Sequence, residues 1–216
     1  PLATGMLPVC LGEATKISAF LLDSDKRYHL QCQLGVSTTT GDAEGEVLET
    51  QDVSSITEQD VKAVLPEFIG KIEQIPPMYS ALKHNGERLY KLARQGIEVE
   101  RKARSVTIHD IEFISLRTDN QQRLILELEV ACSKGTYVRT LAEDIAKKLH
   151  CGAHITALRR LSVGPYDGEM LTIEQLTEFA AQGEEKLDSC MQTIDSGVAD
   201  WPDVPLGSAA AFYVQQ

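Results

Sequence analysis

The sequence lacks any recognisable cysteine motif. Its 216 residues include 5 Cys, an odd number, and no Cys-x-x-Cys occurs. Disulfide frameworks use even numbers of cysteines and zinc sites use closely paired ones, so the sequence indicates neither. We expect most of these thiols to be small core residues. They are Cys10, Cys32, Cys132, Cys151 and Cys190.

Long hydrophobic runs are also missing. No stretch approaches the roughly 18 uncharged apolar residues that a membrane-spanning helix needs. Residues 1–22 carry internal charges, which a secretory signal peptide does not have. We therefore expect a cytoplasmic protein with no membrane partner. The composition, 43% hydrophobic and 25% charged, is globular, and a chain of this length suits one large domain with a small appendage.

Basic residues are the scarcer charge, but they are concentrated in one segment. The 21 Lys and Arg against 32 Asp and Glu give a net charge of -11. Residues 165–216 hold ten acidic residues and a single basic one, Lys186. Residues 76–104, in contrast, hold seven basic residues and three acidic ones. Such a segment suits contacts to RNA phosphates, although an ordinary solvated loop and helix face has the same composition.

Several catalytic motifs are absent as well. Neither a Gly-rich phosphate loop nor a serine nucleophile elbow occurs, which argues against nucleotide hydrolysis and serine hydrolase chemistry. The histidines are scattered, and none has a second ligand at the spacing of a helix-borne pair, so no metal site is predicted. They are His29, His84, His109, His150 and His154.

The pattern of apolar residues predicts helices mixed with hairpin-connected strands. Alternation predicts strands over residues 27–34, 46–49, 105–116, 123–132 and 153–163. Helical spacing and capping residues predict a helical turn and a helix within 4–22, and helices over 57–70, 88–94, 138–149 and 172–181. The final residues, 210–216, read as a strand. This order predicts an α+β fold with a mixed, largely antiparallel sheet flanked by helices.

A set of short motifs carries the strongest functional signal. The motifs are Pro1-Leu2-Ala3-Thr4-Gly5-Met6-Leu7, Gly12-Glu13-Ala14-Thr15-Lys16, Asp25-Lys26-Arg27-Tyr28, Cys132-Ser133-Lys134-Gly135-Thr136-Tyr137-Val138-Arg139-Thr140, Gly152-Ala153-His154 and Leu158-Arg159-Arg160-Leu161. Together they closely resemble the bacterial tRNA pseudouridine-55 synthase family, the B-type or TruB synthases. The resemblance runs in register from Pro1 to about residue 165.

The resemblance implies an activity and an organisation. The family converts uridine 55 in the T loop of tRNA to pseudouridine: the base is flipped out, an aspartate drives cleavage of the glycosidic bond, and the base is rejoined through carbon, without metal or redox cofactor. Residues 1–165 would form the catalytic domain, with residues 76–104 closing over the T stem-loop like a thumb. Residues 166–216 would form an acidic helix and linker leading toward a PUA-type RNA-binding domain. We expect a monomer.

The same resemblance assigns residues to the substrate pocket. Tyr28 matches the tyrosine that stacks on the flipped base, and its phenol can take part in proton transfer. Arg139 matches the arginine that pairs with the catalytic carboxylate. Tyr137 matches a residue of the substrate pocket, and Leu158 matches the apolar residue that lies under the base.

Other residues match motif positions farther from the base. Lys16 and Asp42 belong to this group, and for Lys16 both contact to phosphate and bracing of the cleft remain open. The candidate RNA contacts of the thumb are Lys83, Arg88, Arg101, Lys102 and Arg104.

The nucleophile of the family falls outside the sequence. The family motif reads Gly-x-Leu-Asp-Pro-x-Ala-Thr-Gly, so the aspartate would immediately precede Pro1. We therefore expect the chain to be a fragment, inactive by itself, in which Arg139 is an unpaired cation facing the cleft. Alternative interpretations are a non-catalytic tRNA-binding or RNA-folding module, a structural scaffold, and a guide-RNA-dependent relative of the same superfamily.

Overall fold

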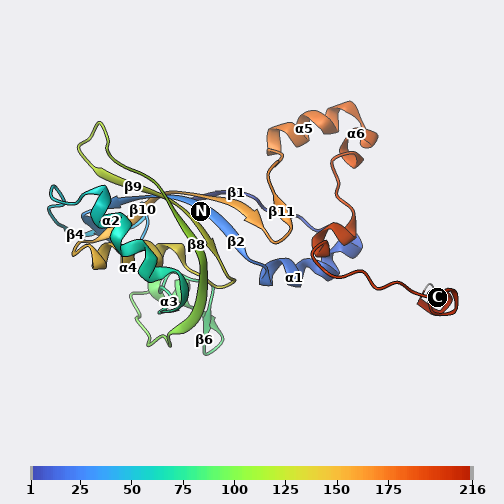
Figure 1. Ribbon diagram of the computed structural model, residues 1–216, viewed down its shortest axis with the longest axis horizontal. Coiled ribbons are helices and arrows are strands. Elements are labelled where there is room, and N and C mark those ends of the chain that lie inside the picture. Colours follow the sequence, from blue (N-terminus) through green and yellow to red (C-terminus); the bar gives the residue numbers. More distant parts are fainter. Residues whose placement is uncertain (1, 215–216) are drawn as a thin grey trace.

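A seven-stranded mixed sheet forms the centre of the computed structural model, which describes residues 2–214 (Figure 1). The strand order is β1-β10-β2-β9-β8-β5, and β11 pairs with β10 outside this path. Every neighbouring pair is antiparallel except β1 with β10. The predicted α+β fold with a largely antiparallel sheet is confirmed. The bounds are β1 Ala3–Gly5, β2 Lys26–Leu34, β5 Gly70–Gln74, β8 Arg104–Thr118, β9 Leu124–Cys132, β10 Ala153–Val163 and β11 Tyr166–Asp167.

One face of this sheet is apolar and the other is polar, because successive side chains of a strand point to opposite faces. In β9, Leu126, Leu128 and Val130 are buried together, as their spacing predicts. The alternate residues Glu127 and Glu129 pair with basic side chains of β2 on the opposite face. Only the apolar face of the sheet therefore has to be shielded from water by other elements.

Two helices cover the apolar face and complete a single core. Thr57 and Asp60 form a reciprocal capping box that begins the first helix, as predicted for Thr57. Val61 of this helix and Ile145 of the second are fully buried in one cluster with Leu128 of β9. The elements of this layer are α2 Glu58–Val64, the continuing 3-10 helix η2 Leu65–Phe68, and α4 Val138–Lys148.

Residues 76–104, called the basic insertion below, form a lobe beside the sheet (Figure 1). Asn85 and Gly86 both have positive φ, 50° and 87°, which is the tight hairpin turn that an Asn-Gly pair favours. A second small hairpin lies outside the insertion and joins β3 to β4. The insertion contains the hairpin strands β6 Lys83–His84 and β7 Glu87–Arg88, followed by helix α3 Leu89–Arg94. The second hairpin consists of β3 Val36–Thr38 and β4 Val47–Thr50.

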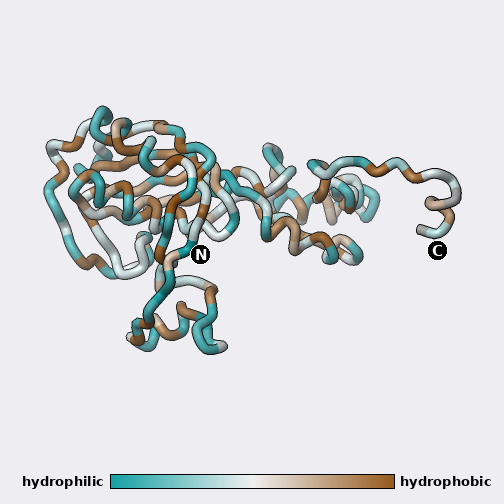
Figure 2. Tube along the Cα trace, turned by 60° about the horizontal axis from the view of Figure 1, so that its bottom comes forward, coloured by the Kyte–Doolittle hydropathy of each residue, from teal (hydrophilic) through white to brown (hydrophobic). Residues whose placement is uncertain are grey.

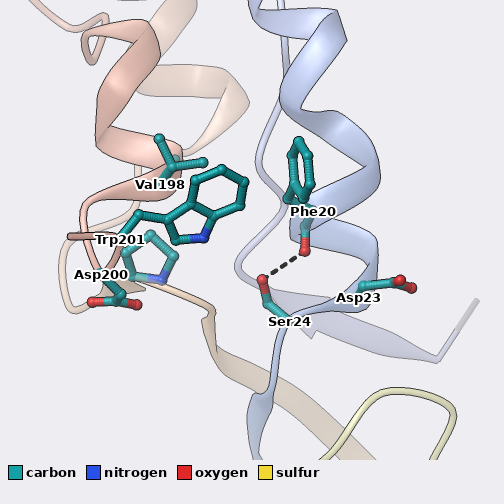
Figure 3. A pocket seen from close by; sticks show the side chains of 8 residues that line it. Phe20, Asp23, Ser24, Val198, Asp200 and Trp201 are labelled. Carbon is teal, nitrogen blue, oxygen red and sulfur yellow. Dashed lines mark hydrogen bonds between the residues drawn. The ribbon is translucent and has the colours of Figure 1, made fainter. Parts of the chain in front are cut away.

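The C-terminal extension, described over residues 166–214, leads away from the sheet body (Figure 2). Thr172 and Gln175 form the predicted capping box at its first helix. Farther on, the chain returns to the body, where the rings of Phe20 and Trp201 pack edge to face with their centroids 4.8 Å apart (Figure 3). Both rings line a cavity of about 200 Å³. The helices of the extension are α5 Ile173–Gln182, α6 Glu184–Asp188, η3 Ile194–Val198 and α7 Ser208–Val214. The part of the body that η3 contacts consists of η1 Gly12–Ile17 and α1 Ser18–Asp23.

Two expectations for the chain ends are wrong. The described part of 210–216 belongs to helix α7, because the alanine run that opens it favours helix more than any other residue type. Residues 215–216 and Pro1 lie outside the described residues. At the other end, the start of the expected helical turn belongs to strand β1, whose partner in β10 is too distant in sequence to leave a local pattern.

The pairing of β1 with β10 predicts a strict requirement for glycine at position 5. Gly5 has φ +98°, and an added Cβ would overlap the backbone carbonyl of Arg160. We expect Gly5→Ala to lower the free energy of unfolding by about 3 kcal/mol or more, since backbone strain and overpacking both contribute. Urea denaturation measures this.

Gly86→Ala is the matched control, because Gly86 has φ +87° but open space around it. It carries the strain alone, about 1 kcal/mol. Equal losses in the two variants would contradict the steric argument for Gly5.

Candidate functional site

A pocket of about 440 Å³ opens where β1, β2 and β10 meet the start of α4. Its wall includes four residues that the sequence resemblance assigns to the substrate pocket, so residues from three distant motifs come together here. The lining residues are Ala3, Thr4, Gly5, Met6, Leu7, Tyr28, Thr136, Tyr137, Val138, Arg139, Leu158 and Arg160.

Strand register builds one wall of the pocket. Tyr28 of β2 lies directly opposite Arg160 of β10, which in turn lies opposite Gly5 of β1. Leu158 is two residues before Arg160 on the same strand, so both side chains are on one face of the sheet. This row places an aromatic ring and an apolar side chain at the base of the pocket.

The environment of Tyr28 keeps its phenol protonated. Burial raises the pKa of Tyr28 above its ordinary value, and the nearby Arg160 guanidinium offsets only part of this effect. At neutral pH the side chain is therefore a hydrogen-bond donor with an aromatic face, rather than a phenolate. Those are the two properties needed to stack on a planar base and to deliver a proton.

Arg139 enters the pocket from the first turn of α4, and it is not the unpaired cation expected from the sequence. Nη1 donates to the carbonyl of Thr40 and to Oδ2 of Asp42, both at 2.8 Å, while Nη2 donates to the carbonyl of Tyr79 at 2.6 Å. The Arg139 side chain is 23% exposed, so its guanidinium needs such acceptors to offset lost hydration. Among the described residues Nε makes no hydrogen bond, so a further acceptor can still be held.

Asp42 lies behind Arg139 rather than in the pocket wall. It is 8% exposed, and its second oxygen accepts from the Thr40 hydroxyl and from the amide of Glu44. A backbone bridge between Asp42 and Ile155 of β10 fixes the loop to the sheet. The carboxylate is thus held in place before it meets the guanidinium, which orients Arg139 toward the pocket.

Lys16 is not among the residues that line the pocket. It lies in η1, and its exposed ammonium pairs with Glu13 one turn earlier. Among the described residues, Lys16 makes no hydrogen bond or ion pair with the pocket lining. Contact to phosphate and bracing of the cleft both remain predictions for this residue.

The candidate RNA contacts of the basic insertion divide into two groups. Arg101 is half-buried: Nη1 donates to the carbonyl of Pro76 at 3.3 Å and Nη2 to Glu98 at 2.9 Å, which ties the two ends of the insertion together. The exposed candidates, whose charged groups remain in solvent, are Lys83, Arg88, Lys102 and Arg104.

Arg160 lines the pocket but was not among the predicted site residues, although it stands in the motif Leu158-Arg159-Arg160-Leu161. Its Nε donates to the carbonyl of Met6 at 2.7 Å, and its guanidinium lines the pocket beside Tyr28. The available signal was the period of two from Leu158, which puts Arg160 on the same face of β10.

No cluster of His, Cys, Asp and Glu that could hold a metal ion occurs among residues 2–214. Within the same residues every helix is too short or too polar to cross a lipid bilayer.

Family comparisons match nearly the whole chain. The family model described as "TruB family pseudouridylate synthase (N terminal domain)" matches residues 1–138. A second, described as "tRNA pseudouridylate synthase B C-terminal domain", matches residues 139–199.

Relatives named tRNA pseudouridine synthase B are about half identical to the chain. The protein of Nitrosococcus oceani is 54% identical over 217 residues, which covers 100% of this chain and 69% of the relative. That of Ectopseudomonas mendocina is 53% identical over 215 residues, covering 99% and 68%.

Solved structures share the fold. The "Crystal Structure of a Cbf5-Nop10-Gar1 Complex" aligns with a TM-score of 0.68 at 25% identity, covering 91% of this chain and 50% of that one. The "Structure of H/ACA RNP bound to a substrate RNA containing 2'-deoxyuridine" aligns with a TM-score of 0.63 at 21% identity, covering 91% and 48%, a likeness of fold alone. The chain thus spans about half the length of these structures.

Because Asp42 and Arg139 form a buried ion pair, removing one of the two charges should strongly lower the free energy of unfolding. We expect Asp42→Asn to lower the free energy of unfolding by about 3 kcal/mol, because it leaves a desolvated guanidinium without its counter-charge. Urea denaturation at pH 7 measures the loss. Glu58→Gln is the control, since the exposed pair of Glu58 with Lys62 should contribute less than about 1 kcal/mol. Similar losses would show that the pair behaves as a surface pair.

Proposed function

The chain belongs to the TruB family of pseudouridylate synthases, and from that premise we propose that it isomerises uridine 55 in the T loop of tRNA to pseudouridine. The observation that carries the proposal is the pocket that Tyr28, Tyr137, Arg139 and Leu158 share. The names of the relatives support tRNA as the substrate.

The proposed substrate must leave the RNA stack before it reacts. Extruding a base costs a few kcal/mol, and stacking on an aromatic ring returns roughly 1 to 3 kcal/mol. Tyr28 supplies that ring, Leu158 supplies an apolar surface under the base, and the protonated Tyr28 phenol is positioned to exchange a proton with it. No metal or redox cofactor has a role in this scheme.

Arg139 is proposed to orient the catalytic carboxylate. The family resemblance puts the nucleophilic aspartate immediately before Pro1, outside the sequence. Asp42, Thr40 and Tyr79 hold the guanidinium from behind, which leaves its free edge for that carboxylate. A preorganised cation favours the ionised, nucleophilic form of the acid.

The remaining parts of the chain are proposed to serve binding. Residues 1–165 form the catalytic unit, with the basic insertion contacting the T stem-loop through its exposed Lys and Arg side chains, and residues 166–216 form an extension. We further propose a monomer in the cytoplasm, a reducing compartment. In support, all five cysteines are free thiols.

Tyr28→Phe tests the proposed chemistry in the full-length protein. It keeps the aromatic face and removes the hydroxyl, so we expect pseudouridine formation to fall about 100-fold or more with little change in tRNA affinity. Tyr166→Phe is the control, because it removes a hydroxyl that bonds Ser196 outside the pocket. Wild-type turnover in Tyr28→Phe would remove the phenol from the mechanism. Binding without any product in the wild-type protein would instead support a non-catalytic RNA-binding module.

The salt dependence of tRNA binding tests the basic insertion. Replacing the exposed Lys102 and Arg104 with Ala should weaken binding and reduce the slope of log affinity against log salt by about one per lost phosphate contact. A double variant of Lys147 and Lys148, at the far end of α4 from the pocket, is the matched control. An unchanged slope in the Lys102 and Arg104 variant would show that these residues belong to an ordinary solvated surface and do not contact phosphate.

A further inference from the structure

Gln74, the last residue of β5, is a buried polar side chain outside the pocket lining. It is 2% exposed. Its Oε1 accepts from the backbone amide of Tyr137 at 3.1 Å, and its Nε2 donates to the carbonyl of Tyr137 at 3.4 Å. Both halves of the amide therefore bond one residue, as a neighbouring strand would.

Tyr137 is the N-cap residue of helix α4, immediately before its first residue Val138. It has φ -100° and ψ 101°, and no side chain of the helix caps this end. Gln74 thus fixes the backbone from which the first turn of α4 starts. Because that turn carries both Tyr137 and Arg139 into the pocket, the position of these side chains depends on the Gln74 amide.

The chain that follows Gln74 contacts the same site and the basic insertion. The carbonyl of Tyr79 accepts from Nη2 of Arg139 at 2.6 Å, and the carbonyl of Pro76 accepts from Arg101 at the other end of the insertion. A segment of a few residues therefore joins the base of the insertion (Figure 1) to the two pocket residues on α4. A buried glutamine at its start is well placed to hold this junction.

We propose that Gln74 is a positioning residue: through the backbone of Tyr137 it sets the placement of Tyr137 and Arg139 against the reacting nucleotide. It does not touch the substrate itself. The inference rests on the proposed function, since it gives Gln74 a part in the same reaction. Its loss should therefore slow the chemical step more than it weakens RNA binding.

Gln74→Met in the full-length protein is the test, because it removes both hydrogen bonds at similar side-chain length. At saturating tRNA we expect the single-turnover rate to fall about 10- to 100-fold, the scale of a small misplacement of catalytic groups, with nearly unchanged affinity for tRNA. Gln74→Glu keeps the acceptor for the Tyr137 amide and should recover part of the rate.

Gln51→Met is the matched control. Gln51 also bonds a backbone amide, that of Gly152 at 2.6 Å, but it lies away from the pocket. It should lose stability while keeping the wild-type rate at saturating tRNA. This separates a role in positioning from a merely structural one.

Distinct outcomes overturn the inference and the proposed function. A folded Gln74→Met protein with the rate of Gln51→Met overturns the inference and leaves the proposed function intact. If Gln74→Met does not fold, Gln74→Asn takes its place, since the shorter side chain stays polar but cannot reach Tyr137; a wild-type rate there is equally decisive. A wild-type protein that forms no pseudouridine overturns both.

Discussion

A guanidinium group that leaves water must find acceptors for its N–H groups, and around Arg139 this requirement joins separate parts of the chain. Helix α4 carries the arginine, the loop after β3 supplies Thr40 and Asp42, and the segment after β5 supplies the carbonyl of Tyr79. Moving any one of these segments would leave a buried polar group without its hydrogen-bond partner. The arrangement of loops around the pocket is therefore set by the needs of one cation.

The opposite wall of the pocket has a different physical origin. Gly5, Arg160 and Tyr28 form a row across β1, β10 and β2 through backbone hydrogen bonds, and Gly5 lets β1 approach because it has no Cβ. Such a ladder is stiff, since each strand is held along its length. Tyr28 thus stands on a wall held by strand pairing, whereas Arg139 is held by side-chain hydrogen bonds to two separate segments of the chain.

Local sequence patterns predicted most of the elements but few of the contacts between them. Alternation in β9 and the helix starts at Thr57 and Thr172 are short-range signals, and the structure confirms them. The partners of Arg139 are 97 and 60 residues away in the sequence, and Gln74 is 63 residues from Tyr137. No local period carries such pairings, so the resemblance could name pocket residues without revealing what holds them.

Charge counting had a similar limit in the basic insertion. Five of the seven basic residues within 76–104 were predicted to contact phosphate, but Arg101 uses both terminal nitrogens to bond Pro76 and Glu98. Its Nε is buried without a partner among the described residues, so this arginine serves the neck of the insertion. In the proposed function, the phosphate contacts of the insertion therefore fall to its exposed cations. Because the acidic residues are concentrated in the C-terminal extension and the basic ones in the insertion, the proposed function implies that an RNA approaches from the side of the insertion.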